Sequence, residues 1–231
     1  MTEKSIPVIA IDGPSGSGKG VITHRLANAL GFHILDSGAL YRLIGLAARK
    51  HDVSFDAEPR LARLARDMKV EFITTTDPED PVQIRLEGQD VTRAIRTDEA
   101  GTDASRVASL VSVREAIKGL QHDFKQAPGL IADGRDMGTV VFVDALVKIY
   151  LTASAEARAD RRYKQLKDKD IDVSLHDLFR SIQRRDERDM NREVAPLVPA
   201  EDAVTIDSTK LGIDDVFNQV LALVKNRLKL R

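Results

Sequence analysis

Residues 8–21 read VIAIDGPSGSGKGV, and this stretch decides the fold of the 231-residue chain. An uninterrupted apolar run from Val8 to Ile11 leads into Asp12 and a glycine-rich turn, and apolar residues then recur at helical spacing from Ile22 to Leu30. A short apolar run bounded by turn residues is typical of a buried strand, and apolar residues three and four apart are typical of a helix. The stretch therefore predicts a strand, a loop and a helix in succession.

The glycine-rich turn has the spacing of a phosphate-binding loop, with a glycine, four residues and then Gly-Lys. Glycines let successive backbone N–H groups converge on phosphate oxygens, the helix N-terminus adds positive potential, and the lysine bridges the terminal phosphates. The alternative is a glycine-rich turn with a surface lysine, which the flanking strand and helix disfavour. We interpret as nucleotide-binding the residues Gly13, Pro14, Ser15, Gly16, Ser17, Gly18, Lys19, Gly20 and Val21.

The loop departs from the usual pattern after the lysine. Ser or Thr commonly stands there and holds magnesium, whereas Gly20 and Val21 have no hydroxyl. Magnesium would have to be held in another way, for example through water or Ser17. We therefore assign no residue as a direct protein ligand of a metal ion, and the five scattered histidines lack the spacing of a zinc site.

Further apolar segments have the length of short strands. They are Phe32–Leu35, Leu130–Ala132, Leu146–Leu151 and Ala203–Ile206. Helical patterns lie between strands, and a last one from Ile213 to Val224 would close one face of a sheet. Strands that alternate with helices indicate a parallel sheet covered on both faces. The predicted fold class is therefore α/β, a P-loop NTPase-type five-stranded parallel sheet with helices on both faces.

Almost a hundred residues between the second and third of these strands do not fit the alternation. Within them, Val70–Thr74 and Val82–Leu86 have the pattern of strands, and turn composition occurs at residues 77–81 and 87–90. Helical patterns stand before and after this piece. We predict one domain over residues 1–231 that carries a small inserted antiparallel piece.

Composition narrows the class of partner. The 35 basic and 36 acidic residues leave a net charge of -1, which disfavours a globally basic nucleic-acid binder. There is no tryptophan and only 4% aromatic residues, so base stacking is not the main means of recognition. The chain has no cysteine, which suits a reducing compartment, and no apolar stretch approaches the roughly 18 residues of a membrane span. We expect a cytoplasmic protein whose partners are neither nucleic acid polymers nor membranes.

Charged residues continue an apolar stripe near the C-terminal end of a predicted helix. Apolar residues recur at helical spacing at Leu175, Leu178, Phe179 and Ile182, and the same spacing leads on to Arg185, Asp189 and Arg192. A solvated charge run is the ordinary interpretation of such a segment. Because these charges continue the face that the apolar residues would bury, we favour an anion-binding cleft.

A second group of arginines follows the fourth predicted strand. Ser154 has the position of a helix cap, which places Arg158, Arg161 and Arg162 on one face of the helix. An exposed helix with salt bridges is the alternative, and the residues alone do not decide between the two.

Two other predicted strands end next to polar residues. Asp133 ends the third strand as a Walker B-like carboxylate would, and a turn residue is the alternative. Ser37, Tyr41 and Arg42 follow the second strand, where ligands cross strand ends in such sheets. Half-buried packing is the alternative for Tyr41.

Five blocks of sequence carry a wider similarity. They are IDGPSGSGKG at 11–20, LDSGALYR at 35–42, IADGRDMGTVVF at 131–142, RRDERDMNR at 184–192, and APLVPA at 195–200 with DST at 207–209. With these blocks the chain resembles the bacterial cytidylate kinases, which are nucleoside monophosphate kinases. The resemblance implies transfer of the terminal phosphate of ATP to CMP or dCMP with Mg²⁺, an inserted monophosphate-binding piece at about 66–100, and a mobile arginine lid at about 154–172. The family's loop commonly reads GKGT, and Val21 departs from it.

The resemblance also implies a role for each candidate residue. It implies a catalytic role at the transferring phosphate for Lys19, Arg158, Arg161, Arg162 and Asp133. It implies that the acceptor nucleotide is bound by Ser37, Tyr41, Arg42, Ser105, Arg114, Arg135, Asp136, Arg185, Asp189 and Arg192. Of these, Arg185 and Asp189 would read the ribose, Arg192 would approach the acceptor phosphate, and Ser105, Arg114 and Asp136 would read the base. A carboxylate that faces the cytosine amino group selects cytosine over uracil, which has a carbonyl there.

Two other classes of protein remain as alternatives. Another P-loop small-molecule kinase, acting on a sugar acid or a coenzyme precursor, is disfavoured by the long insert and by the Arg-Asp-Arg stripe. A nucleotide switch of the GTPase class would need an Asn-Lys-x-Asp guanine reader, which the sequence does not contain. We expect a monomer with ATP, CMP and dCMP as its small-molecule partners.

Overall fold

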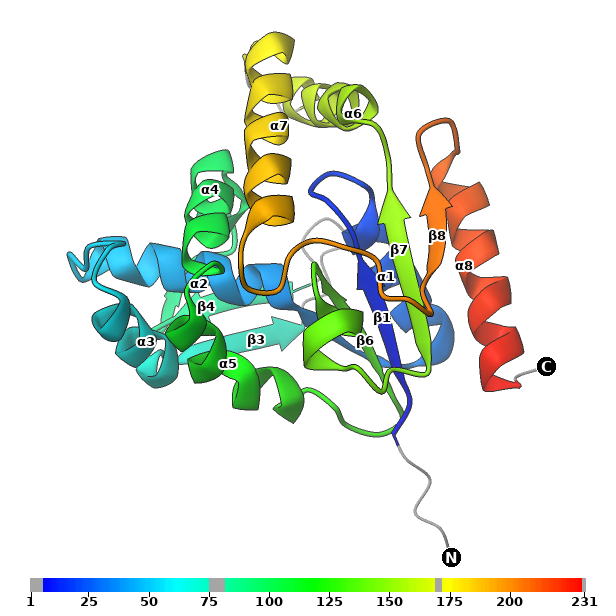
Figure 1. The fold of residues 1–231 in the computed structure, drawn as a ribbon, viewed down its shortest axis with the longest axis horizontal. Coiled ribbons are helices and arrows are strands. Elements are labelled where there is room, and N and C mark those ends of the chain that lie inside the picture. The colour runs from blue at the N-terminus through cyan, green and yellow to red at the C-terminus, as the bar shows by residue number, and fades with distance from the viewer. Residues whose placement is uncertain (1–5, 75–81, 169–171, 230–231) are drawn as a thin grey trace, which may run out of the picture. The chain divides into compact units, whose positions relative to one another are not determined.

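The computed structural model describes residues 6–74, 82–168 and 172–229, and the chain divides into two compact units. One comprises Met1–Asp36 and Gln121–Arg231, and we call it the sheet unit; the other comprises Ser37–Leu120, and we call it the insert unit. Figure 1 shows the elements of each.

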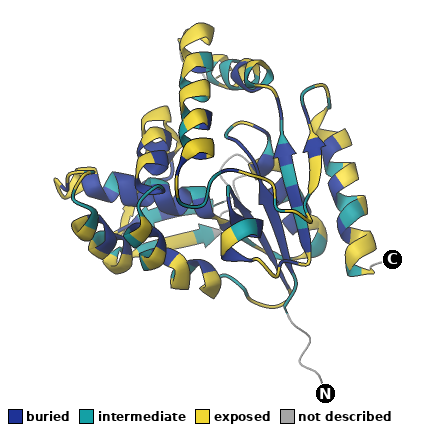
Figure 2. Ribbon diagram, viewed as in Figure 1, coloured by how far each residue is buried: buried dark blue, intermediate teal, exposed yellow. Residues whose placement is uncertain are grey.

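A parallel sheet of five strands forms the centre of the sheet unit, in the order β2-β6-β1-β7-β8. The strands are β1 (Val8–Asp12), β2 (His33–Asp36), β6 (Leu130–Gly134), β7 (Val147–Thr152) and β8 (Val204–Asp207). All residues of β1 and β6 are buried, as Figure 2 shows, which is expected of central strands in a parallel sheet. The five predicted strands and their parallel arrangement are confirmed, with differences of one or two residues at the strand ends.

Four helices and one short turn of π-helix lie wholly within the described residues of the sheet unit. They are α1 (Lys19–Leu30), the π-helix η2 (Met137–Val141), α6 (Ala155–Lys167), α7 (Leu175–Asn191) and α8 (Ile213–Leu228). Apolar residues of α1 and α8 pack on the sheet in one core, where Leu26 and Val220 join Ile9, Ile11 and Ile149. The more polar helices α6 and α7 contact each other beyond the carboxyl end of β7 (Figure 1).

The strand order determines where a ligand can approach this sheet. β1 is the central strand, between β6 and β7. The chain passes from β1 through α1 to β2 on one side of β1 in the sheet, whereas β7 and β8 lie on the other side. In parallel α/β sheets, ligands bind outside the carboxyl ends of the strands at the point where the strand order reverses. The loop that follows β1 occupies this point.

The insert unit combines helices with a small antiparallel sheet. Its elements are α2 (Ser37–Lys50), α3 (Glu58–Asp67), β3 (Val70–Thr74), β4 (Val82–Leu86), β5 (Gln89–Asp90), the 3-10 helix η1 (Ala94–Arg96), α4 (Asp98–Val107) and most of α5 (Val111–Asp123). No described helix, in either unit, has an apolar stretch of the length needed to cross a lipid bilayer.

The predicted strands β3 and β4 are confirmed, and they pair antiparallel. The predicted turn at 77–81 lies outside the described residues. The prediction of a turn at 87–90 is wrong for Gln89 and Asp90, which pair with Leu86 and Arg85 as a third strand. The turn itself is shorter, because Glu87 and Gly88 both have positive φ, of 52° and 79°, and two such residues reverse the chain within a hairpin.

Candidate functional site

The glycine loop that joins β1 to α1 requires glycine for steric reasons. At Gly13, where φ is +149°, an added Cβ would lie 2.0 Å from the carbonyl oxygen of Leu151 on the neighbouring strand. Gly16 and Gly18 also have positive φ, of 79° and 96°, which L-residues rarely adopt. The glycine spacing in the sequence therefore reflects a backbone path that side chains would block.

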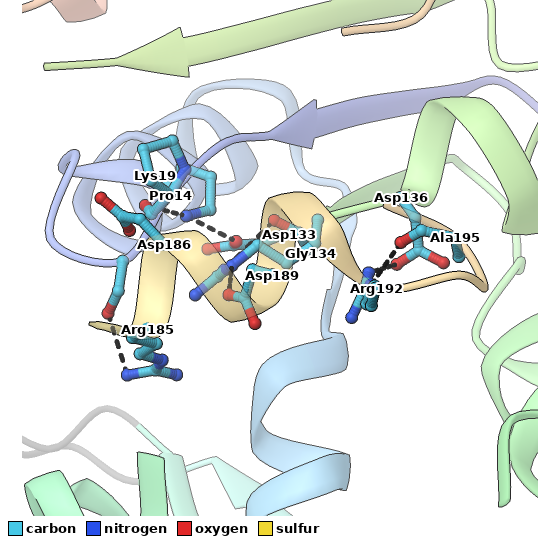
Figure 3. Close-up of polar contacts among 12 residues, drawn as sticks. Pro14, Lys19, Asp133, Gly134, Asp136, Arg185, Asp186, Asp189, Arg192 and Ala195 are labelled. Atoms are coloured by element: carbon cyan, nitrogen blue, oxygen red, sulfur yellow. Dashed lines mark hydrogen bonds and ion pairs between the residues drawn. The ribbon is translucent and has the colours of Figure 1, made fainter. Parts of the chain in front are cut away.

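Lys19 is the first residue of α1, and its side chain is buried. Its Nζ donates to the Pro14 carbonyl at 2.9 Å and lies 3.9 Å from Oδ1 of Asp133 (Figure 3). Burial, together with the charge of Arg135, lowers the pKa of Lys19 to about 7, while Asp133 and Asp12 oppose this shift. An anion beside the ammonium group would favour its charged form.

Asp12 ends β1 and fixes the turn that follows β6. Its two carboxylate oxygens accept N–H bonds from Met137 and Gly138, both at 2.8 Å. Burial raises the pKa of Asp12 to about 7, although these two hydrogen bonds oppose the rise. The carboxylate thereby ties the turn that carries Arg135 and Asp136 to the strand that leads into the glycine loop.

Four charged residues from the β6 turn and the end of α7 form a second buried group. Nε of Arg135 donates to Oδ2 of Asp189 at 3.1 Å, and Nη2 of Arg192 lies 3.8 Å from Oδ1 of Asp136 (Figure 3). Burial disfavours the charged form of Arg135, but the carboxylates of Asp189 and Asp133 outweigh it and hold its pKa above the ordinary value. The group presents two guanidinium ions at the carboxyl edge of the sheet, each beside a carboxylate.

The C-terminal half of α7 has one buried and one exposed face. Asp186 and Asp189 are buried, whereas Arg184 and Glu187 are exposed. Arg185 is partly buried, and its Nη1 donates to Oγ of Ser15 in the glycine loop at 3.1 Å (Figure 3). The predicted stripe residues on α7 are therefore brought together with the glycine loop and the β6 turn.

Arg158 and Arg161 of α6 lie close to the glycine loop, Arg161 through Ser208. The predicted cap is confirmed, because Oγ of Ser154 accepts from the Ala157 N–H at 3.2 Å. Arg161 donates to Oγ of Ser208 at 3.1 Å and also to the Ser208 carbonyl, while Ser208 Oγ donates to the carbonyl of Ser17 at 3.3 Å.

The other two α6 arginines differ in burial. Arg158 is buried and contacts both the loop and α7, whereas Arg162 is partly buried. Residues 169–171 of the predicted lid lie outside the described residues.

The insert unit holds the remaining candidate residues. Ser37 and Tyr41 are buried on α2, and Arg42 donates to the Ile95 carbonyl at 2.7 Å. Ser105 on α4 and Arg114 on α5 are buried, so they are not the surface residues that their helical pattern alone would indicate. The guanidinium carbon of Arg114 lies 5.9 Å from the centroid of the Tyr41 ring, so the structure brings these two residues together. Nη1 of Arg114 also donates to the Ala108 carbonyl at 3.2 Å.

Three residues of the site are not identified by the sequence patterns. Asp12 has a signal, since it is a carboxylate at the end of a buried central strand, directly before the glycine loop. Asp186 is one acidic residue within a run of charged residues, and nothing in that run distinguishes it. Ser208 lies in the DST block, but its contacts with the loop depend on the pairing of β8 with β7.

Ser17 in the glycine loop and Asp133 beside Lys19 both carry oxygen atoms of the kind that a hard cation prefers. Oγ of Ser17 is buried and has no hydrogen-bond partner among the described residues. Gly20, where a hydroxyl residue is usual, leaves space, since an added Cβ would lie 3.9 Å from Oδ2 of Asp133. A hydroxyl and a carboxylate are ligand types that Mg²⁺ prefers, so the residues present fit this ion. No group of three or more His, Cys, Asp or Glu side chains within the described residues is arranged to hold a metal by itself.

Comparisons with known proteins give a consistent result over almost the whole chain. Residues 9–226 match the family model described as cytidylate kinase. The chain is 55% identical to the cytidylate kinase of Shewanella amazonensis over 228 residues, which covers 99% of this chain and 98% of that protein. It is 56% identical to the cytidylate kinase of Aeromonas hydrophila subsp. hydrophila over 222 residues, which covers 96% of this chain and 95% of that protein.

Proposed function

Because the chain belongs to the cytidylate kinase family, we propose that it transfers the terminal phosphate of ATP to CMP and dCMP and releases the diphosphates. The chain is a phosphotransferase. The observation that best supports the chemistry is the buried Lys19 of the glycine loop, which lies 3.9 Å from Asp133. Phosphoryl transfer asks little covalent work of a protein and much positive charge in line with the moving group, which such a lysine supplies.

We assign the donor side to the glycine loop. Residues 13–21 would bind the phosphates of ATP through backbone N–H groups and the side chain of Lys19. The buried side chain of Lys19 would place a positive charge beside those phosphates, where solvent screens its attraction to them only weakly. Arg161 and Arg162 of the lid, at about 154–172, would add positive charge as that group moves.

Mg²⁺ would be held by Asp133 and Ser17. When bound, the ion supplies charge that neutralises the phosphate oxygens during transfer. This assignment places the hydroxyl two residues before Lys19, whereas the usual loop has it one residue after. Two observations support a hydroxyl before Lys19 in place of one after it. Gly20 has no side chain, and the buried Oγ of Ser17 has no hydrogen-bond partner in the described part of the chain.

We assign the acceptor side to α7, the β6 turn and the insert unit. Arg185 and Asp189 would bind the ribose, and Arg192 would bind the acceptor phosphate. Arg135 and Asp136 would lie at the base.

The insert unit contributes to the acceptor site in the same proposal. From it, the acceptor nucleotide would be bound by Ser37, Tyr41, Arg42, Ser105 and Arg114. The antiparallel piece at about 66–100 would be the part that binds the monophosphate.

We further propose that the enzyme acts as a monomer in the cytoplasm, on small molecules only. The assigned donor and acceptor residues all come from this one chain, and the chain has no cysteine, which suits a reducing compartment. Analytical ultracentrifugation at assay concentration, with and without nucleotides, tests this state, and a stable dimer would contradict it.

An acceptor panel tests the proposed activity. ADP formation is followed with MgATP and either CMP, dCMP, UMP, AMP or GMP. CMP and dCMP should exceed the other three by at least about 100-fold in kcat/KM, because a site that pairs with the cytosine amino group leaves its own buried polar groups unpaired with other bases. The alternative, another P-loop small-molecule kinase, would be favoured if none of the five nucleotides were phosphorylated.

Lys19→Ala provides the loss-of-function control for the panel. Removal of the ammonium ion should lower turnover of CMP by roughly 100- to 1,000-fold, because its charge acts on the moving phosphoryl group. Circular dichroism should show an unchanged fold, since the Lys19 side chain donates one hydrogen bond, to the Pro14 carbonyl of the loop. A folded variant with normal turnover would contradict the phosphate-loop assignment.

A further inference from the structure

Arg158 has the contacts of a residue that holds structure in place. Its Nε donates to the Ala153 carbonyl at 2.9 Å, and its Nη1 donates to the Ser15 carbonyl at 3.0 Å and to Oδ1 of Asp186 at 3.1 Å. Its Nη2 donates to the other carboxylate oxygen of Asp186. All three nitrogens are therefore engaged, and the side chain is only 4% exposed. If Arg158 turned toward a phosphate, it would leave the buried carboxylate of Asp186 without its ion pair, which is costly.

The glycine loop packs directly against this pair. A Cβ added to Gly16 would lie 3.3 Å from Cβ of Arg158, so the loop touches the stem of the arginine as well as its charged end. Ser15 is also held from α7, since Arg185 donates to its Oγ while Arg158 binds its carbonyl. The position of Ser15 thus depends on two neighbours, one on α6 and one on α7.

Asp186 connects Arg158 to the part of α7 that belongs to the proposed acceptor site. It lies next to Arg185 and one helical turn before Asp189, and both of these residues belong to the proposed acceptor site. A bidentate pair between arginine and carboxylate fixes both distance and angle, which a lysine or an amide cannot reproduce. The pair therefore links the loop proposed for ATP to the helix proposed for the acceptor.

We propose that the Arg158–Asp186 pair is a positioning element that couples the two substrate sites, so that a nucleotide bound at the loop favours CMP binding at α7. The proposal rests on the proposed function for the identity of the two ligands. Coupling between sites is reciprocal, so CMP must favour the donor nucleotide by the same factor. Arg158 then acts through Ser15 and Asp186, in place of the direct contact with phosphate that the family resemblance implies.

Calorimetry measures this coupling directly. The Kd of CMP is determined alone and with saturating β,γ-methylene-ATP and Mg²⁺, which bind without reaction, and the ratio is the coupling factor. For the wild-type protein we expect a factor of at least about 5, which is the lower end of ordinary couplings. Asp186→Asn and Arg158→Lys should each reduce it below about twofold, because neither retains the bidentate pair. The matched controls Glu187→Gln and Arg184→Lys, which change exposed neighbours on α7, should keep the wild-type factor.

A double variant keeps the test valid if a single variant unfolds. Replacing both partners by apolar residues, Arg158→Met with Asp186→Leu, leaves no buried charge unpaired and often preserves the fold. It should fold, bind each ligand and show no coupling. A wild-type factor of 1, or a double variant that keeps the wild-type factor, would overturn the proposal. If the acceptor panel instead identifies a different substrate, the proposed function fails, and the coupling is then measured with that substrate in place of CMP.

Discussion

Asp12 gives the protein a stability that depends on pH near neutrality. The carboxylate is buried at the end of β1 and accepts two backbone N–H bonds, and burial raises its pKa from 3.8 to about 7. In the unfolded chain the group loses its proton near its ordinary pKa, so the folded state binds more protons between these two values. Its contribution to stability is therefore complete below about pH 4 and is lost as the pH rises through 7.

The size of this effect follows from the two pKa values. Each unit of pKa difference corresponds to about 1.4 kcal/mol, and integration from pH 5 to pH 7 gives a loss of about 2 kcal/mol from Asp12. Asp12→Asn removes the titration. Urea unfolding of the nucleotide-free protein at pH 5, 6 and 7 should show that the free energy of unfolding of the wild type falls by about 2 kcal/mol relative to that of the variant.

Two controls separate the titration of Asp12 from a general change in stability. Asn at position 12 offers an NH₂ group to one of the two N–H donors, so the variant is less stable at every pH, but that constant offset does not alter the slope. Asp160→Asn changes an exposed carboxylate on α6 and should leave the wild-type slope intact. If the wild type and Asp12→Asn gave parallel curves, the assignment of a neutral-range pKa to Asp12 would be refuted.

Three further predictions concern individual side chains. Gly13→Ala should destabilise the fold by about 3 kcal/mol or more and weaken ATP binding, because its Cβ would collide with the Leu151 carbonyl. Thermal unfolding and nucleotide titration test this prediction, and a normal melting temperature would contradict it. Asp136→Asn should reduce the ratio of kcat/KM for CMP over UMP by at least about tenfold, because an amide can accept from the cytosine amino group or donate to the uracil carbonyl. An unchanged ratio would remove Asp136 from the base site. Arg192→Ala should lower kcat/KM for CMP by about 30- to 1,000-fold, whereas Arg184→Ala, which changes an exposed residue, should change it less than about fivefold. Equal small effects would remove Arg192 from the acceptor site.

The fold could be predicted where backbone requirements dominate. Buried parallel strands need continuous apolar runs, and the loop after β1 needs glycine because Leu151 stands in the way of a side chain, so both left clear signals in the sequence. β5 left none, because Gln89 and Asp90 are polar and their pairing depends on the positive φ of the two residues before them. A hydrophobic pattern does not contain that information.

The site was predictable only in part, for a different physical reason. A helical stripe pointed to Arg185, Asp189 and Arg192, because burial of one helix face is a local property. The pairing of Arg158 with Asp186 joins residues 28 apart on two helices, and it depends on how α6 packs against α7. Ser105 and Arg114 had no local signal at all, and only the family resemblance singled them out.

Several charged side chains are buried at the carboxyl edge of the sheet, which does not favour the stability of the fold. Lys19, Arg135 and Asp12 are each desolvated there, and the shifted pKa of Lys19 and of Asp12 shows that burial outweighs their partners. Replacing buried ion pairs by well-packed apolar residues often stabilises a protein, so selection for stability would not maintain this group. Transfer of a phosphate between two anionic nucleotides requires charges that are fixed in position before the substrates arrive, since they then need no rearrangement during the reaction. Buried charges of this kind are expected of a site that holds anions, and Lys19 should affect both the pH dependence of folding and the rate of transfer.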